Sequence, residues 1–166
     1  MPIPSGYTSG QVVQAVPTII ENKVVQIVTA TTNTPTGNTT ATYADTTLTA
    51  TITPTSASNK VLVFATQNGC VKLRDTGGGS PNTWLQLRLL RGATEITLGE
   101  QMGGYNNGAS LITGFGTSAI NYLDSPATTS ATTYKTQFRG NAASTEGMAV
   151  NQQNSVSFIT LMEVTP

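Results

Sequence analysis

The side chains that could perform acid–base or nucleophilic chemistry are few and far apart. The 166-residue chain has no histidine and one cysteine, Cys70. Without an imidazole there is no Ser-His-Asp or Cys-His arrangement and no histidine-ligated zinc. A single cysteine excludes an internal disulfide and a multi-cysteine metal site. Cys70 would need some other base to act as a nucleophile, so we expect it to be a small buried apolar residue.

Glycoside hydrolysis needs only two carboxylates, and the sequence contains eight acidic residues. They are scattered singly, as Glu21, Asp45, Asp75, Glu95, Glu100, Asp124, Glu146 and Glu163. A lone carboxylate on a β-protein is more often solvated or caps a turn. The glycine run at 77–79 lacks the Lys-Ser/Thr pair and the following helix of a phosphate-binding loop. We therefore predict a protein that is not an enzyme and has no cofactor and no metal.

Sugar binding would require exposed aromatic side chains beside neutral polar groups. The candidates are Trp84, Tyr105 and Tyr122, with Gln101, Asn106 and Asn107 near Tyr105 in the sequence. Aromatic residues in strands are generally core or interface residues. Both interpretations of the three aromatic residues therefore stay open at this point.

The charge of the chain argues against two classes of partner. Charged residues make up 10% of the sequence, and eight basic residues balance eight acidic ones. The chain therefore has no basic field that would attract nucleic acid or an anionic membrane surface. No apolar run approaches the ~18 residues of a membrane-spanning helix, and the N-terminus lacks the features of a signal peptide. We expect synthesis in a cytoplasm, and neither nucleic acid nor membrane as a partner.

The elements that would position these residues are strands. The length predicts one domain, which we place at residues 21–166. Eight segments have the pattern of strands: 23–31, 46–53, 60–66, 83–92, 95–100, 110–124, 133–140 and 155–164. No segment convincingly suits a helix longer than about two turns. This pattern predicts an all-β protein, an antiparallel β-sandwich or jelly roll of about eight strands.

Alternation within these segments predicts which side chains face the core. In 83–92 we expect Leu85, Leu87 and Leu89 to face inward, with Trp84 facing outward. After a short hairpin at 91–94, Ile96 and Leu98 are expected to face inward. The segment 60–66 is apolar at consecutive positions, so we expect a second sheet or a neighbouring subunit to cover its outer side. Gly114 and Gly116 indicate a bulge or a bend, and Pro126 is expected to end the preceding strand.

Four phrases of the sequence carry a resemblance. They are SASNKVLVFAT, LRLLRGATEI, NYLDSPATTSATTYKTQFRG and SVSFITLMEV, and they occur in this order between Lys23 and Val164. The phrases resemble the pattern of small structural proteins of tailed bacteriophages, especially the C-terminal domains of tail fibres and related virion-surface appendages. The resemblance implies a β-sandwich, usually a homotrimer, exposed on the virion. Fibre proteins usually carry a long N-terminal shaft or docking domain, so this chain is expected to decorate the capsid or to form a small knob or fibre tip.

Residues 1–20 form a predicted N-terminal arm. Pro2, Pro4 and Pro17 disfavour a helix. Apolar residues are spaced along this extended segment: Ile3, Tyr7, Val12, Val13, Val16, Ile19 and Ile20. Such a segment suits docking against a sheet edge or a groove between subunits, whereas an ordinary frayed terminus is the alternative. We predict that the first five of these residues attach the protein to the virion.

Two functions remain open from the sequence. In the first, the protein is a trimeric structural element of the virion surface, a decoration or cement protein or a short fibre-type appendage, whose partners are its own copies and other virion proteins. In the second, it is a tail-fibre binding module whose loops recognise a host surface polysaccharide.

Overall fold

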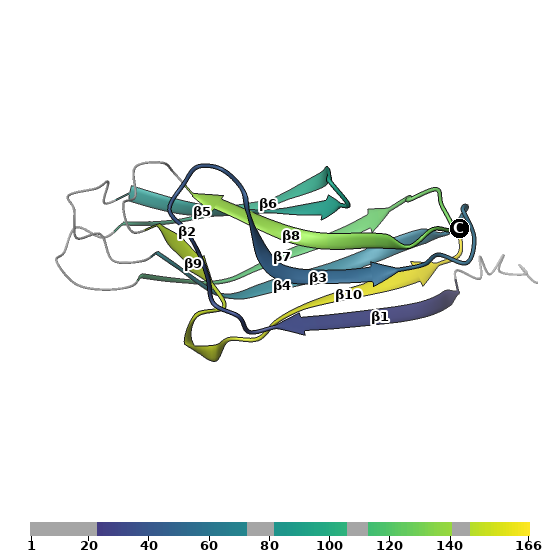
Figure 1. The fold of residues 1–166 in the computed structure, drawn as a ribbon, viewed down its shortest axis with the longest axis horizontal. Coiled ribbons are helices and arrows are strands. Elements are labelled where there is room, and N and C mark those ends of the chain that lie inside the picture. Colours follow the sequence, from purple (N-terminus) through teal and green to yellow (C-terminus); the bar gives the residue numbers. More distant parts are fainter. Residues whose placement is uncertain (1–22, 73–81, 106–112, 141–146) are drawn as a thin grey trace, which may run out of the picture.

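The computed structural model describes residues 23–72, 82–105, 113–140 and 147–166 (Figure 1). Its ten strands are β1 (Val24–Thr32), β2 (Thr36–Asn38), β3 (Ala44–Ile52), β4 (Lys60–Lys72), β5 (Asn82–Arg91), β6 (Thr94–Tyr105), β7 (Thr113–Asp124), β8 (Thr132–Gly140), β9 (Met148–Val150) and β10 (Ser157–Val164). A single turn, η1 (Gln152–Asn154), joins β9 to β10. No helix within these ranges is long and apolar enough to cross a membrane.

The strands form two antiparallel sheets. Sheet A has the order β1-β10-β4-β9-β2, with β7 paired to the other edge of β4, and sheet B has the order β3-β8-β5-β6. One edge of β4 serves two partners, because β10 pairs with 60–66 and β9 pairs with 71–72. The sheets lie against each other in a sandwich-like arrangement (Figure 1). The all-β, antiparallel character expected from the sequence is therefore confirmed.

The interior is built from alternate residues of strands in both sheets. Leu48 and Ile52 of β3, Leu87 of β5, Val63 of β4 and Leu161 of β10 are all buried in one apolar cluster. These residues come from both sheets, so each sheet covers the apolar face of the other. Cys70 is also buried in this cluster, as expected.

A hydrogen-bonded polar cluster lies in the same interior and joins the two sheets. The side chain of Gln67 in β4 donates to Asn151 Oδ1 at 2.7 Å and to Ser157 Oγ at 2.8 Å. Thr136 of β8 donates to Gln67 Oε1 at 3.4 Å, and Asn151 Nδ2 donates to the Thr34 carbonyl at 2.8 Å. Because these buried polar groups are partnered, their burial does not carry the penalty of an unsatisfied donor or acceptor.

The strand count differs from the expected eight. The eight expected segments correspond to β1, β3, β4, β5, β6, β7, β8 and β10, whereas β2 and β9 are additional. Each of these two strands has three residues, which is too short for an alternating pattern to appear. In addition, β4 continues six residues past the expected end at 66, to Lys72.

The expectation for Leu98 is wrong. Leu98 is 49% exposed and pairs with Arg88 on the outer face of sheet B. The cause is a β-bulge: Leu90 pairs with Glu95 but Leu89 pairs with Thr97, so β6 carries one extra residue there. Past that residue the alternation of β6 is reversed, which turns Leu98 outward, while Ile96 packs against the core as expected.

The outer side of 60–66 is not covered by a second sheet formed by the described residues. Along β4 the inward residues are buried and the outward ones, such as Leu62 and Phe64, are partly exposed. The expected cover on this side is therefore absent from the part of the single chain that the structure describes.

The expected irregularity at Gly114 and Gly116 is confirmed by two register shifts between β4 and β7. β7 ends at Asp124, shortly before Pro126.

Candidate functional site

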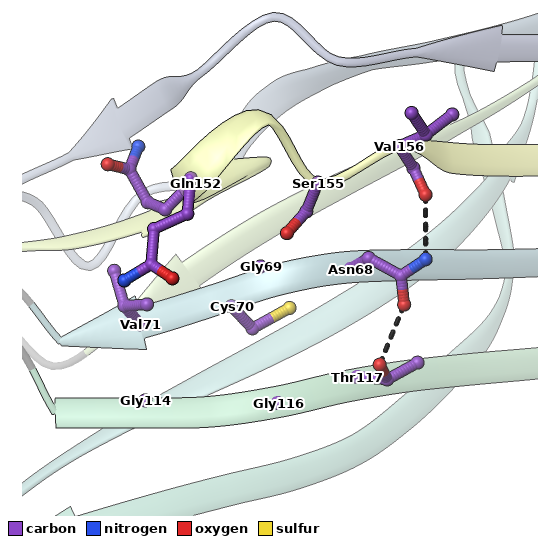
Figure 2. Close-up of a pocket in the computed structure, with 11 residues that line it drawn as sticks. Asn68, Gly69, Cys70, Val71, Gly114, Gly116, Thr117, Gln152, Ser155 and Val156 are labelled. Carbon is purple, nitrogen blue, oxygen red and sulfur yellow. Dashed lines mark hydrogen bonds between the residues drawn. The ribbon is translucent and has the colours of Figure 1, made fainter.

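An open groove lies where β4, β7 and the η1 segment meet (Figure 2). Its volume is about 710 Å³, and its lining residues are Asn68, Gly69, Cys70, Val71, Gly114, Gly116, Thr117, Gln152, Gln153, Ser155 and Val156. The side chain of Asn68 spans it, donating to the Val156 carbonyl at 2.7 Å and accepting from Thr117 Oγ1 at 2.7 Å (Figure 2). Asn68 thereby fixes the start of β10 and the middle of β7 to β4.

Glycines shape the groove in two different ways. Gly69 has φ of +60°, and a Cβ there would lie 2.5 Å from the backbone nitrogen of Gln152. Gly69 therefore allows η1 to pack directly on β4. At Gly114 and Gly116 a Cβ would meet no atom within 4 Å, so along β7 the groove is open to solvent at the backbone.

The groove has little chemical reactivity. Cys70 is its one ionisable lining residue, and burial raises the pKa of the thiol to about 12, against a smaller lowering by a hydrogen bond from the Ser118 backbone. A thiol with this pKa is protonated at neutral pH and is a poor nucleophile. The described lining offers amide, hydroxyl and backbone groups, which can form hydrogen bonds.

The outer face of sheet B presents a different surface, in which two arginines contact aromatic rings. The guanidinium carbon of Arg88 lies 3.9 Å from the centroid of the Tyr43 ring, and that of Arg139 lies 4.7 Å from the same centroid. Arg139 also lies 5.6 Å from the centroid of the Trp84 ring. These distances are within the range of cation–π interactions. We call Tyr43, Trp84 and Arg139, with Gln86 between them, the Trp84–Arg139 surface.

Hydrogen bonds between side chains hold this face in place. Gln86 Oε1 accepts from Tyr43 Oη at 3.1 Å and from Arg139 Nη2 at 3.3 Å. Gln137 Oε1 accepts from Arg88 Nε at 2.9 Å, and Gln137 Nε2 donates to Asp45 at 2.7 Å. The outward residues of β5 and β8 are therefore connected rather than independent solvated side chains.

The carboxylates take part in structural interactions. Arg88 forms an ion pair with Glu95 at 3.0 Å, and Lys135 forms one with Asp45 at 3.0 Å. Burial alone would raise the pKa of Asp45, but hydrogen bonds from Gln137 and Lys135 outweigh burial and lower this pKa. No group of three or more potential metal-binding side chains occurs in the described ranges.

Two of the four phrases that carry the phage resemblance meet at a buried carboxylate. Asp124, from the phrase NYLDSPATTSATTYKTQFRG, accepts from Arg91 Nη1 at 2.9 Å on both oxygens, and Arg91 belongs to the phrase LRLLRGATEI. Tyr134 Oη donates to the same carboxylate at 2.7 Å. Burial and then the neighbouring Asp124 raise the pKa of Tyr134. These residues join β5, β7 and β8, so they stabilise the fold rather than form an open site.

The aromatic candidates from the sequence are divided between the two sheets, with Trp84 and Tyr105 in sheet B and Tyr122 in sheet A. Trp84 is half-buried on the outer face of sheet B, where it was expected. Tyr122 packs against the core from sheet A, which is one of the two placements that the sequence left open. Tyr105 pairs with Asn82 at the end of β6. Asn106, Asn107 and the docking candidates Ile3, Tyr7, Val12, Val13 and Val16 lie outside the described residues.

The sequence does not indicate that Tyr43 and Arg139 lie on the same surface as Trp84. Tyr43 lies 41 residues before Trp84 and Arg139 lies 55 residues after it. Only the pairing of β5 with β8 brings Arg139 opposite Gln86. Arg139 could be placed outward by alternation in 133–140, but its contact with an aromatic residue could not.

The outer face of sheet A carries a row of apolar side chains. Cross-strand pairing aligns Ile27, Met162, Leu62 and Leu123, from four neighbouring strands. Ile27 is 57% exposed and Leu123 is 49% exposed. We call these four residues the apolar row. Apart from Leu98, the exposed large apolar side chains of the described residues lie in β1, in β7 or around β10: Val24, Val25, Ile27, Leu123, Val156 and Phe158.

Comparisons with family models and with curated proteins identify no related protein. No protein-family model matches the sequence, and no curated protein matches it significantly.

Proposed function

We propose that this protein is a non-enzymatic structural protein of a tailed-bacteriophage particle. In this proposal it is a homotrimeric decoration or cement protein, or a short fibre-type appendage, on the virion surface. Its partners are its own copies and other capsid, tail or appendage proteins. Two observations support the proposal. The first is the resemblance of the four phrases to phage structural proteins, and the second is the apolar row on sheet A.

The apolar row supports assembly because a protein–protein contact would remove its apolar side chains from water. Ile27, Met162, Leu62 and Leu123 are consecutive neighbours across four strands, so they form one continuous strip. Contiguous exposed apolar surface commonly marks a protein–protein contact. A flat sheet face packs well against another sheet face, and a second copy of the chain supplies such a face at equal concentration.

The order of the strands supports a jelly roll as the finer description of the fold. β1-β10-β4-β7 make four neighbouring strands of sheet A, and β3-β8-β5-β6 make sheet B. Two four-stranded antiparallel sheets with crossing connections are the jelly-roll arrangement, which occurs in viral capsid proteins and in lectins. Because one fold serves many functions, this topology is compatible with both candidate functions.

The test is the composition of the particle. In purified particles of the phage that encodes the chain, quantitative mass spectrometry should find it in a fixed ratio to the major capsid or tail protein, and antibody labelling should place it outside the shell or on an appendage. Absence from washed particles, with the protein present in the infected cell, would refute the structural function.

The N-terminal arm has a separate role in the proposal. We propose that residues 1–20 attach the trimer to the particle through Ile3, Tyr7, Val12, Val13 and Val16, while residues 21–166 fold and trimerise without them. Deletion of residues 2–18 should leave a folded, soluble trimer that no longer enters particles. Normal incorporation of the truncated protein would exclude this role of the arm.

A second candidate function is a receptor-binding module for a host surface polysaccharide. The observation that favours it is the Trp84–Arg139 surface, which places an aromatic ring, an arginine and an amide side by side. Location on a tail appendage, together with loss of host adsorption when the protein is removed, would favour this function over capsid decoration.

A further inference from the structure

The Trp84–Arg139 surface contains a cation that forms no ion pair with the described residues around it. Arg139 is half-buried, and it forms no ion pair with the residues that the structure describes, whereas Arg88 pairs with Glu95 and Arg91 with Asp124. Its Nε is buried and has no hydrogen-bond partner in the described chain. The guanidinium has thus lost part of its hydration without gaining an anion.

The position of this guanidinium is nevertheless fixed. The rings of Tyr43 and Trp84 lie 4.7 Å and 5.6 Å from its carbon, and its Nη2 donates to Gln86 at 3.3 Å. The aromatic contacts stabilise the cation but cannot replace a hydrogen-bond acceptor. A carboxylate or phosphate group would supply the anion that the Arg139 guanidinium lacks among the described residues, because charge-assisted hydrogen bonds to a guanidinium are strong.

The surroundings of Arg139 have the features of a sugar platform. Trp84 pairs with Gly103 on β6, so on the β6 side no side chain stands directly opposite the indole. In the next row, Gln86 pairs with Arg139 on one side and with Gln101 on the other. Gln101 is exposed, so an amide that can donate and accept lies one row from the indole ring. Aromatic rings contact the apolar faces of sugars, and planar amides bind their hydroxyl groups.

We propose that the Trp84–Arg139 surface binds an acidic saccharide. The carboxylate or phosphate group of the sugar binds Arg139, its ring lies against Trp84, and its hydroxyl groups bind Gln86 and Gln101. A nucleic acid is a poorer fit, because its binding depends on neutralising several phosphates and the chain has a net charge of zero. This inference deepens the second candidate function by naming the class of glycan, and it is independent of the trimer.

Trp84 provides the measurement, because it is the one tryptophan of the chain. Titration of the purified full-length protein with glucuronate, galacturonate and glucose 1-phosphate should change the fluorescence of Trp84 in a saturable way. Glucose, which has the ring without the charge, should bind at least about tenfold more weakly, since a hydrogen bond to a charged group contributes roughly 1.5–3 kcal/mol. Inorganic phosphate should also bind more weakly than glucose 1-phosphate, because it lacks the sugar ring.

Variants separate a specific site from general attraction. Arg139→Gln should weaken binding of the acidic sugars at least about tenfold, as expected for a lost charge-assisted contact. Lys135→Gln is the matched control: it removes the same charge from the same face and the same strand, at a residue that pairs with Asp45, and it should leave affinity within about twofold. Trp84→Ala should weaken binding by a similar factor to Arg139→Gln, measured by calorimetry since the fluorophore is lost.

Four results would overturn the inference. They are no response of Trp84 to any of the three acidic sugars, equal affinity for glucose, equal losses in Arg139→Gln and Lys135→Gln, and tighter binding of a single-stranded DNA oligonucleotide. The assay uses the isolated chain, so a negative result leaves the particle composition, and with it the structural function, to be decided separately.

Discussion

At the scale of the residue, Glu163 is the carboxylate with the most hydrogen bonds in the described chain. It is buried and accepts from Gln26 Nε2 at 2.6 Å, from Asn59 Nδ2 at 2.6 Å, and from the Thr55 backbone and hydroxyl at 2.7 Å and 2.8 Å. Burial alone would raise the pKa of Glu163, but these donors outweigh burial and lower the pKa to about 2. The carboxylate therefore fixes β10 to β1 and to the turn before β4.

We expect Glu163→Gln to lower the free energy of unfolding by about 1–3 kcal/mol, because an amide would place a donor against existing donors. Urea denaturation at neutral pH measures this change. Glu95→Gln is the control, because Glu95 is 40% exposed and forms a single ion pair; its effect should be below about 1 kcal/mol. Equal effects of the two substitutions would contradict the structural role of Glu163.

The pH dependence of stability follows from the same residue. The pKa of Glu163 is about 2 in the folded protein and 4.5 ordinarily, so the unfolded chain binds the proton first as pH falls. The stabilisation by Glu163 is therefore complete above pH 4.5 and is lost as pH falls from 4.5 towards 2. The wild-type protein should lose more stability over this interval than Glu163→Gln. Parallel profiles, measured by thermal unfolding, would show that another group is responsible.

At the scale of the element, the bulged middle of β4 depends on Gly69. Alanine at this position would meet backbone atoms of Gln152 at 2.5 Å and 2.7 Å, and φ is +60°. Either η1 must shift or β4 must change conformation, so we expect Gly69→Ala to destabilise the protein by about 1–3 kcal/mol or more. Gly114→Ala is the matched control on the paired strand, because nothing lies within 4 Å of its Cβ and its effect should stay within about 0.5 kcal/mol. Comparable losses in the two variants, measured by thermal unfolding, would contradict this account.

The sequence predicts which side chains of a strand face the core wherever apolar and polar residues alternate regularly along it. Leu85, Leu87 and Leu89 are buried as expected, because one buried face imposes a period of two. Leu98 could not be placed, because a bulge adds a residue without leaving a mark in the pattern. For the Trp84–Arg139 surface, alternation places Trp84 and Arg139 outward, but their contact could not be predicted, since the pairing of β5 with β8 and the approach of Tyr43 depend on contacts between distant parts of the chain.

At the scale of the whole molecule, the apolar row predicts self-association, and the phage resemblance makes a homotrimer the expected assembly. Size-exclusion chromatography with light scattering should give three times the 17.3 kDa mass of the chain. Ile27→Lys and Leu123→Lys should shift the protein to monomer, because a charge buried in an apolar contact has no partner. Their side chains are 57% and 49% exposed, so the fold itself should survive.

Leu98→Lys provides the control for the trimer. Leu98 has the same 49% exposure as Leu123 but lies on sheet B, opposite Arg88, so this substitution should leave the trimer intact. A wild-type monomer at micromolar concentration, or dissociation by Leu98→Lys as readily as by Leu123→Lys, would remove the basis of the proposed assembly.

The place of β10 determines when the chain can fold during synthesis. β10 follows the other described strands in the chain, yet it lies between β1 and β4 in sheet A (Figure 1). Until β10 leaves the ribosome, β1 has no neighbour in its sheet, and the polar cluster lacks Ser157. Nascent chains that end before Ser157 therefore leave β1 unpaired and one edge of β4 open along 60–66, and unpaired strand edges expose a chain to aggregation. During synthesis, sheet A therefore cannot be completed before its eight-residue strand β10 has emerged.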